Sequence, residues 1–182
     1  MPLVRAMSES AIHAAYKTLL SRGRLTMNPG QAALVARLAT LQQTLLQTEE
    51  PQLGLYIYGC VGTGKSRLAD LFESTLPSQI SKRRVHFHEF MMDIHSRLHR
   101  ARSLPTYSGD PLVQIGKDVR SESRVLCFDE FQVSDIADAL ILKRLFGAIW
   151  NSGGGMVSTS NRHPNNLVRR MLFLVSSFYA MH

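Results

Sequence analysis

The residues best suited to chemistry form one short stretch, Gly59-Cys60-Val61-Gly62-Thr63-Gly64-Lys65-Ser66. Their types and spacing match a phosphate-binding loop, in which glycines let backbone N–H groups approach an anion without a Cβ in the way. We expect Lys65 to reach the β- and γ-phosphates of a bound nucleotide. The Ser66 hydroxyl is expected to occupy one coordination position of Mg²⁺. A plain glycine-rich turn is the alternative.

Two adjacent carboxylates, Asp129 and Glu130, follow the apolar run 125–128. Acids at the carboxyl end of a strand lie at the edge where open α/β sheets bind ligands. We expect Asp129 to hold Mg²⁺, directly or through water, and Glu130 to polarise the water that attacks the γ-phosphate. Adjacent strand residues point to opposite faces, so two separate roles are compatible. The alternative is a strand that simply ends in acids.

Asn161 follows the apolar pair Met156-Val157 and three hydroxyl-bearing residues, Ser158, Thr159 and Ser160. The strand that contains this pair is expected to end at the same edge of the sheet as the strands before Gly59 and before Asp129. The Asn161 amide is therefore expected to orient the attacking water or to contact the γ-phosphate. The alternative is a strand that ends in turn-forming residues.

Four histidines lie close together in the sequence, at positions 86, 88, 95 and 99. If 84–90 is a strand and 93–99 a helix, the first two share a strand face and the last two a helix face, as a metal site would require. We favour histidines that are hydrogen-bonded in or near a core, because such sites also need second-shell partners.

These residues require a sheet to position them. The continuous apolar run 53–58 is typical of a strand covered on both faces, and further strands are predicted at 84–90, 125–128 and 156–159. Helical patterns follow at 65–76, 93–99, 112–119 and 136–150. This alternation predicts an α/β fold of the P-loop NTPase type, with a parallel sheet flanked by helices.

Before the first strand, apolar residues spaced three and four apart predict a helix that stops at Gly23, and a second helix capped by Asn28. We therefore expect residues 1–50 to form a helical segment that packs on the core.

Composition restricts the possible functions. At 182 residues, of which 45% are hydrophobic, the chain suits one domain with a real core. The net charge of +7 is spread over scattered basic residues, so we predict no dedicated nucleic-acid site. Two cysteines form no disulfide framework, which indicates a reducing compartment, and no apolar run is long enough to predict a transmembrane segment. The basic N-terminus is equally compatible with a transit peptide and a surface helix.

Three further stretches resemble the AFG-like ATPases: Arg84-Val85-His86-Phe87-His88-Glu89-Phe90-Met91-Met92-Asp93-Ile94-His95, Cys127-Phe128-Asp129-Glu130-Phe131-Gln132-Val133-Ser134-Asp135-Ile136-Ala137-Asp138-Ala139 and Thr159-Ser160-Asn161-Arg162. The resemblance implies an AAA-type core that binds ATP and Mg²⁺, hydrolyses ATP, acts on protein clients and assembles into a ring-like homo-oligomer. Residues 59–66 would form the Walker A loop, Asp129 and Glu130 the Walker B pair, and Asn161 the first sensor. Eukaryotic relatives imply a mitochondrial location and a role in protein quality control, and bacterial relatives a cytoplasmic one.

The resemblance ends after Leu167, so it implies an incomplete P-loop ATPase core over 51–167 and a divergent C-terminal tail over 168–182. We therefore expect the small helical lid of the family to be missing. We also expect the strand that normally lies beside the first strand to be absent, which would leave the loop-bearing strand at an exposed edge. Residues 171–181 could form a substitute strand or a short helix. A shortened nucleotide-binding module with little or no turnover is thus the alternative to an active ATPase.

Overall fold

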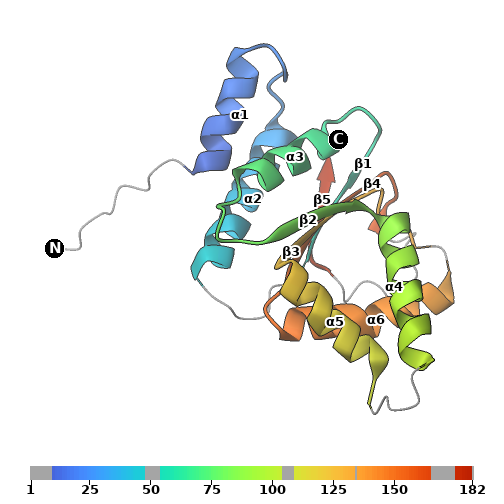
Figure 1. The fold of residues 1–182 in the computed structure, drawn as a ribbon. Coiled ribbons are helices and arrows are strands. Elements are labelled where there is room, and N and C mark those ends of the chain that lie inside the picture. Colours follow the sequence, from blue (N-terminus) through green and yellow to red (C-terminus); the bar gives the residue numbers. More distant parts are fainter. Residues whose placement is uncertain (1–9, 48–53, 104–108, 134, 165–174, 182) are drawn as a thin grey trace.

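A single parallel sheet forms the centre of the molecule (Figure 1). The computed structural model describes residues 10–47, 54–103, 109–133, 135–164 and 175–181. The sheet has the order β2-β3-β4-β1-β5, and each neighbouring pair of strands is parallel. Its strands are β1 (Gly54–Gly59), β2 (Lys82–His86), β3 (Val125–Asp129), β4 (Gly155–Ser160) and β5 (Val175–Met181).

Helices cover both faces of this sheet (Figure 1), which confirms the predicted α/β architecture. One face packs against α1 (Ala11–Ser21), α2 (Pro29–Gln47) and α3 (Lys65–Thr75). The other face packs against α4 (Phe87–Arg102), α5 (Pro111–Glu122) and α6 (Ile136–Asn151). None of the helices in the described part of the chain is long and apolar enough to cross a membrane.

The alternation of side chains along β1 joins the two cores. Leu55 and Ile57 belong to the cluster under α1–α3, whereas Tyr56 belongs to the cluster under α4–α6. All three are buried, as expected for a strand covered on both faces. The β1 strand is thus held from both sides, and the loop that follows it starts from a fixed point.

The second strand is shorter than predicted. β2 ends at His86, and α4 begins at Phe87, so the predicted strand over 84–90 is wrong in its second half. The buried residues of α4 are Phe87, Phe90, Met91, Ile94 and Leu98, a helical spacing that places one face in the core. This periodicity outweighs the short alternation of His86-Phe87-His88.

The four-histidine alternative loses its basis with this change, because His88 lies on the helix and not on a strand face with His86. Within the described ranges, no group of three or more His, Cys, Asp or Glu side chains is placed to hold a metal ion.

The expectation of an exposed edge at β1 is also wrong. β5 pairs with β1 in parallel, from Leu55 opposite Ser177 to Gly59 opposite Met181. Of the two alternatives for 171–181, the structure has the strand over Val175–Met181, and residues 171–174 lie outside the described part. β1 therefore lies between β4 and β5, an interior position in the sheet.

Candidate functional site

The loop between β1 and α3 has the conformation of an anion-binding turn. Gly62 and Gly64 have φ values of +86° and +91°, a region that favours glycine. Gly64 is the N-cap residue of α3, and no side-chain cap hydrogen bond is formed there within the described part of the chain. The Thr63 hydroxyl donates instead to the Cys60 carbonyl at 3.0 Å, inside the loop. The positive end of α3 is thus available to an anion.

Lys65 is held in place without a counter-charge. Its ammonium donates to the carbonyls of Gly59 at 3.0 Å and Cys60 at 2.6 Å, and only 6% of the residue is exposed. No carboxylate is paired with it among the described residues. Burial lowers the pKa of Lys65, an effect that the nearby Cys60 partly opposes. A phosphate at the loop would supply the missing negative charge.

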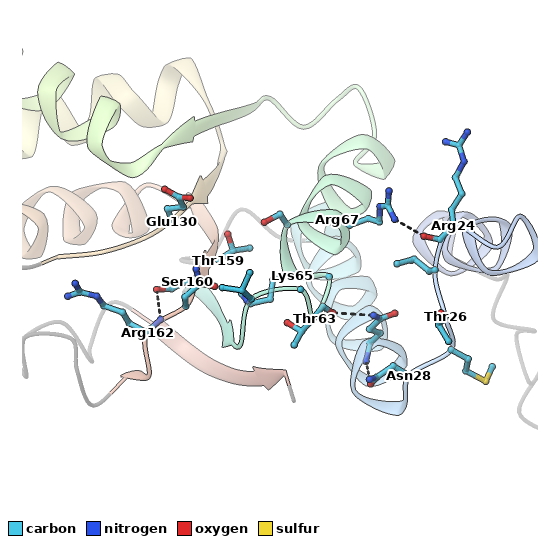
Figure 2. Close-up of a pocket in the computed structure, with 18 of the residues that line it drawn as sticks. Arg24, Thr26, Asn28, Thr63, Lys65, Arg67, Glu130, Thr159, Ser160 and Arg162 are labelled. Atoms are coloured by element: carbon cyan, nitrogen blue, oxygen red, sulfur yellow. Dashed lines mark hydrogen bonds between the residues drawn. The ribbon is translucent and has the colours of Figure 1, made fainter.

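A cavity of about 980 Å³ opens in front of this loop (Figure 2). Four cationic residues line it, against one carboxylate, Glu130, so the cavity favours a polyanion. In Figure 2, Lys65 lies between the end of β4, marked by Thr159 and Ser160, and the loop that carries Thr26 and Asn28. The four cationic residues are Arg24, Lys65, Arg67 and Arg162.

Glu130 reaches this cavity through an unusual backbone conformation. Its φ is +55°, and it is the one non-glycine residue with positive φ in the described part of the chain. The next residue, Phe131, donates its N–H to the Thr159 carbonyl at 2.8 Å, which ties the turn to β4. We expected strand alternation to separate Asp129 from Glu130. The separation is present, but it arises because β3 ends at Asp129 and the chain turns there.

Asp129 is engaged with its neighbours rather than with the cavity. Arg84 donates from Nε to Oδ2 at 2.7 Å and from Nη2 to Oδ1 at 2.9 Å. The Thr159 hydroxyl lies 3.4 Å from Oδ1. Among the described residues that line the cavity, Glu130 is included and Asp129 is not. The two adjacent acids thus face different surroundings.

The remaining predicted residues lie around the same opening. Asn161 is exposed directly after β4 and lines the cavity. Ser66 lines it too, at the start of α3, as do residues 61–65. Gly59 and Cys60 are absent from the lining but hold Lys65 through their carbonyls. The structure therefore brings Lys65, Ser66, Glu130 and Asn161 to one cavity.

The donor set is compatible with Mg²⁺. The Ser66 hydroxyl and the Asp129 carboxylate are hard oxygen ligands of the type that Mg²⁺ prefers. Mg²⁺ commonly takes one or two protein ligands and completes its shell with phosphate oxygens and water, so Ser66 on the cavity fits it, whereas Asp129 fits it once Arg84 releases the carboxylate.

Sequence reasoning missed one wall of the cavity, which residues 23–28 and Gln31 form. Gln31 donates from Nε2 to the Thr63 carbonyl at 3.2 Å and accepts from the Tyr16 hydroxyl at 3.4 Å. Arg67 donates to the Arg24 carbonyl at 2.6 Å. Gln31 is buried in the first turn of α2, and its contacts with Thr63 and Tyr16 join positions that are far apart in the sequence. Gln132 and Arg162, which also line the cavity, gave no separate signal.

Solved structures with low sequence identity share this fold. A DNA replication initiation factor aligns with a TM-score of 0.64 at 14% identity, over 87% of this chain and 48% of that one. The DnaC helicase loader aligns with a TM-score of 0.60 at 13% identity, over 86% of this chain and 92% of that one. At such identities the likeness concerns the fold alone, and it agrees with the predicted α/β fold of a parallel sheet flanked by helices.

Sequence comparison gives the closer relationship. "Lactation elevated protein 1 homolog B" of Danio rerio is 44% identical over 138 residues, which make up 72% of this chain and 27% of that protein. "Cell division protein ZapE" of Escherichia coli K12 is 41% identical over 145 residues, 79% of this chain and 37% of that protein. This chain therefore spans a minor part of the length of these relatives. The family model described as AFG1-like ATPase matches residues 7–177. The chain belongs to the AFG1-like ATPase family.

Proposed function

We propose that this chain binds ATP in the cavity between residues 59–66, β4 and the 23–28 loop, and hydrolyses it with Mg²⁺. The observation that carries the proposal is the position of Glu130 and Lys65 on one cavity. Lys65 is buried, and among the residues that the structure describes it bonds only to backbone carbonyls. Phosphoryl transfer depends mainly on positioning and on charge stabilisation, and this arrangement supplies both.

Each residue would then have a distinct role. The N–H groups at the start of α3 and the Lys65 ammonium would bind the β- and γ-phosphates. Glu130 would orient the attacking water and accept its proton, and the Asn161 amide would hold that water or the γ-phosphate. Ser66 and Asp129 would hold Mg²⁺, which supplies charge neutralisation between the β- and γ-phosphates.

The proposal extends to assembly and location. Family membership supports a homo-oligomer that acts on protein clients. The resemblance to the family supports a mitochondrial role in protein quality control. The alternative is a bacterial cytoplasmic role, and the Escherichia coli relative is described as a cell division protein.

A second candidate function is a nucleotide-binding module with little or no turnover. The observation that favours it is the Asp129 carboxylate, which is bound by Arg84 and does not line the cavity. In that case ATP would bind, but the metal would not be held correctly for transfer.

The test compares Glu130→Gln with the parent chain. We expect the variant to keep its ATP affinity, measured by calorimetry, and to lose turnover by about 10²- to 10⁴-fold in a steady-state phosphate-release assay. The matched control is Glu122→Gln, which removes a carboxylate that is paired with Arg97 outside the cavity. Unchanged hydrolysis by Glu130→Gln would refute the role of Glu130. ATP binding without turnover by the parent chain at every protein concentration would favour the module.

A further inference from the structure

Arg84 on β2 bridges two carboxylates from different elements. It makes two parallel hydrogen bonds to Asp129 at the end of β3, at 2.7 and 2.9 Å, and an ion pair with Asp70 on α3. The side chains of Arg84 and Asp129 are only 23% and 17% exposed, whereas that of Asp70 is 61% exposed. The contact of Arg84 with Asp129 is thus more buried than its contact with Asp70.

The bridge also connects the two halves of the site. Asp70 lies four residues after Ser66, which places the two side chains on the same side of α3. Arg84 therefore joins the helix that carries the phosphate-binding loop to the acid at the end of β3. Two parallel hydrogen bonds from one guanidinium fix the orientation of a carboxylate and also stabilise the contact.

A guanidinium on both oxygens of Asp129 also opposes a second cation. A bare Mg²⁺ that approaches this carboxylate meets a like charge next to it and must displace charge-assisted hydrogen bonds. Bound nucleotide phosphates change this balance, because they add negative charge and most of the oxygen ligands that Mg²⁺ requires. If Asp129 binds a metal ion, Arg84 can keep its ion pair with the Asp70 carboxylate.

We propose that Arg84 is a positioning residue that holds Asp129 in the ligand-free chain and makes metal binding at Asp129 depend on bound nucleotide. This inference rests on the proposed function, in which Asp129 is a Mg²⁺ ligand. It adds that Arg84 occupies the Asp129 carboxylate until nucleotide binds, and that the ion pair between Arg84 and Asp70 determines how tightly Arg84 holds Asp129.

The test measures metal binding without turnover. Mn²⁺ replaces Mg²⁺, and its binding to the nucleotide-free chain is followed by electron paramagnetic resonance. We expect Arg84→Gln to bind Mn²⁺ at least about tenfold more tightly than the parent chain, and Arg84→Lys to be intermediate, since it keeps the charge but loses the fork. Asp129→Asn in the Arg84→Gln background should remove the gain. The matched control, Arg83→Gln, removes ion pairs to Asp93 and Glu122 from the neighbouring strand position and should leave Mn²⁺ binding unchanged.

Asp70→Asn provides a second test with the opposite sign. Among the described residues, this surface substitution leaves Asp129 as the one carboxylate bound to Arg84, so Arg84 should hold Asp129 more tightly. The Mn²⁺ concentration at which ATP binding is half-maximal should therefore rise severalfold. A folded Arg84→Gln or Arg84→Lys chain with parental Mn²⁺ binding, or an Asp70→Asn chain with an unchanged Mn²⁺ requirement, would overturn the inference. Failure of the proposed function has a different signature: the parent chain would bind no ATP with or without the metal.

Discussion

The side-chain amide of Gln31 donates a hydrogen bond to the Thr63 carbonyl, over 3.2 Å, and so links the first turn of α2 to the loop between β1 and α3. Gln31 is buried, and its oxygen accepts from the Tyr16 hydroxyl on α1. A Cβ added at Gly64 would lie 3.1 Å from the Gln31 nitrogen, so the amide also packs tightly against the loop. The loop is therefore braced from the N-terminal helices as well as from β1.

Removal of this brace should weaken nucleotide binding. We expect Gln31→Ala to lower ATP affinity by about fivefold, because loss of one hydrogen bond of roughly 1 kcal/mol leaves the loop less ordered before binding. Calorimetric titration measures the change. The matched control is Gln42→Ala, since Gln42 is also buried on α2 but donates to the Phe72 carbonyl and the Thr75 hydroxyl. Equal losses of affinity in the two variants would show a general loss of stability rather than a local brace.

The contribution of Gln31 illustrates what the sequence could predict and what it could not. Residues 59–66 and the pair Asp129-Glu130 were predictable because their chemistry follows from local spacing after an apolar run. The Gln31 contact joins positions 32 residues apart, and the Arg84–Asp129 contact joins positions 45 apart. Such contacts depend on how α2 packs and on how β2 and β3 align, and no local pattern encodes either.

The predicted strand over 84–90 and the predicted exposed edge at β1 were wrong for the same reason: packing and pairing with distant segments, and not the local pattern, determine these elements. Apolar and polar residues alternate only over His86-Phe87-His88, whereas the apolar residues from Phe87 to Leu98 have helical spacing. The segment forms α4 because this longer pattern is buried, with Phe87 and Phe90 in contact with Phe128 and Phe146. β5 is recognised as a strand only through its pairing with β1, because its sequence alone permits a strand or a helix.

Backbone strain at Glu130 gives a prediction about stability. Its φ of +55° costs a residue with a Cβ about 1 kcal/mol relative to glycine. We therefore expect Glu130→Gly to be about 1 kcal/mol more stable than Glu130→Ala in urea unfolding, although both lack the carboxylate and neither should hydrolyse ATP. The comparison between the two variants cancels the loss of the side chain. Equal stabilities would mean that the backbone relaxes at no cost.

The contact between α5 and α6 depends on a glycine. A Cβ at Gly116 would lie 2.7 Å from the Ala148 Cβ and 2.8 Å from the Leu145 carbonyl oxygen, so the helices would have to separate. We expect Gly116→Ala to lower the free energy of unfolding by about 1 to 3 kcal/mol. Gly147→Ala is the control: this position on α6 has no atom within 4 Å of the added Cβ. It should stabilise the chain by about 0.5 to 1 kcal/mol through helix propensity, and both effects are measurable by urea unfolding.

An acid-dependent contribution to stability is expected from Asp93 on α4. Burial alone would raise the pKa of its carboxyl, but a hydrogen bond and the charge of Arg97, together with Arg83, outweigh burial and hold the pKa below its ordinary value of 3.8. Arg97 donates to Asp93 at 2.9 Å, and Arg83 lies 3.4 Å away. A carboxyl whose pKa falls on folding stabilises the native state at pH values above the unfolded pKa. This contribution is lost as the pH falls through the lower, folded value.

Asp93→Asn should therefore destabilise the chain at pH 6, and the difference from the parent should shrink steadily as urea unfolding is repeated from pH 5 towards pH 2. Asp118→Asn controls for net charge, because the Asp118 carboxylate accepts from the Gln114 amide rather than from a cation. A constant difference between Asp93→Asn and the parent over this range would contradict the prediction. It would mean that Asp93 contributes through packing or neutral hydrogen bonds, and that its ion pairs with Arg97 and Arg83 do not stabilise the fold.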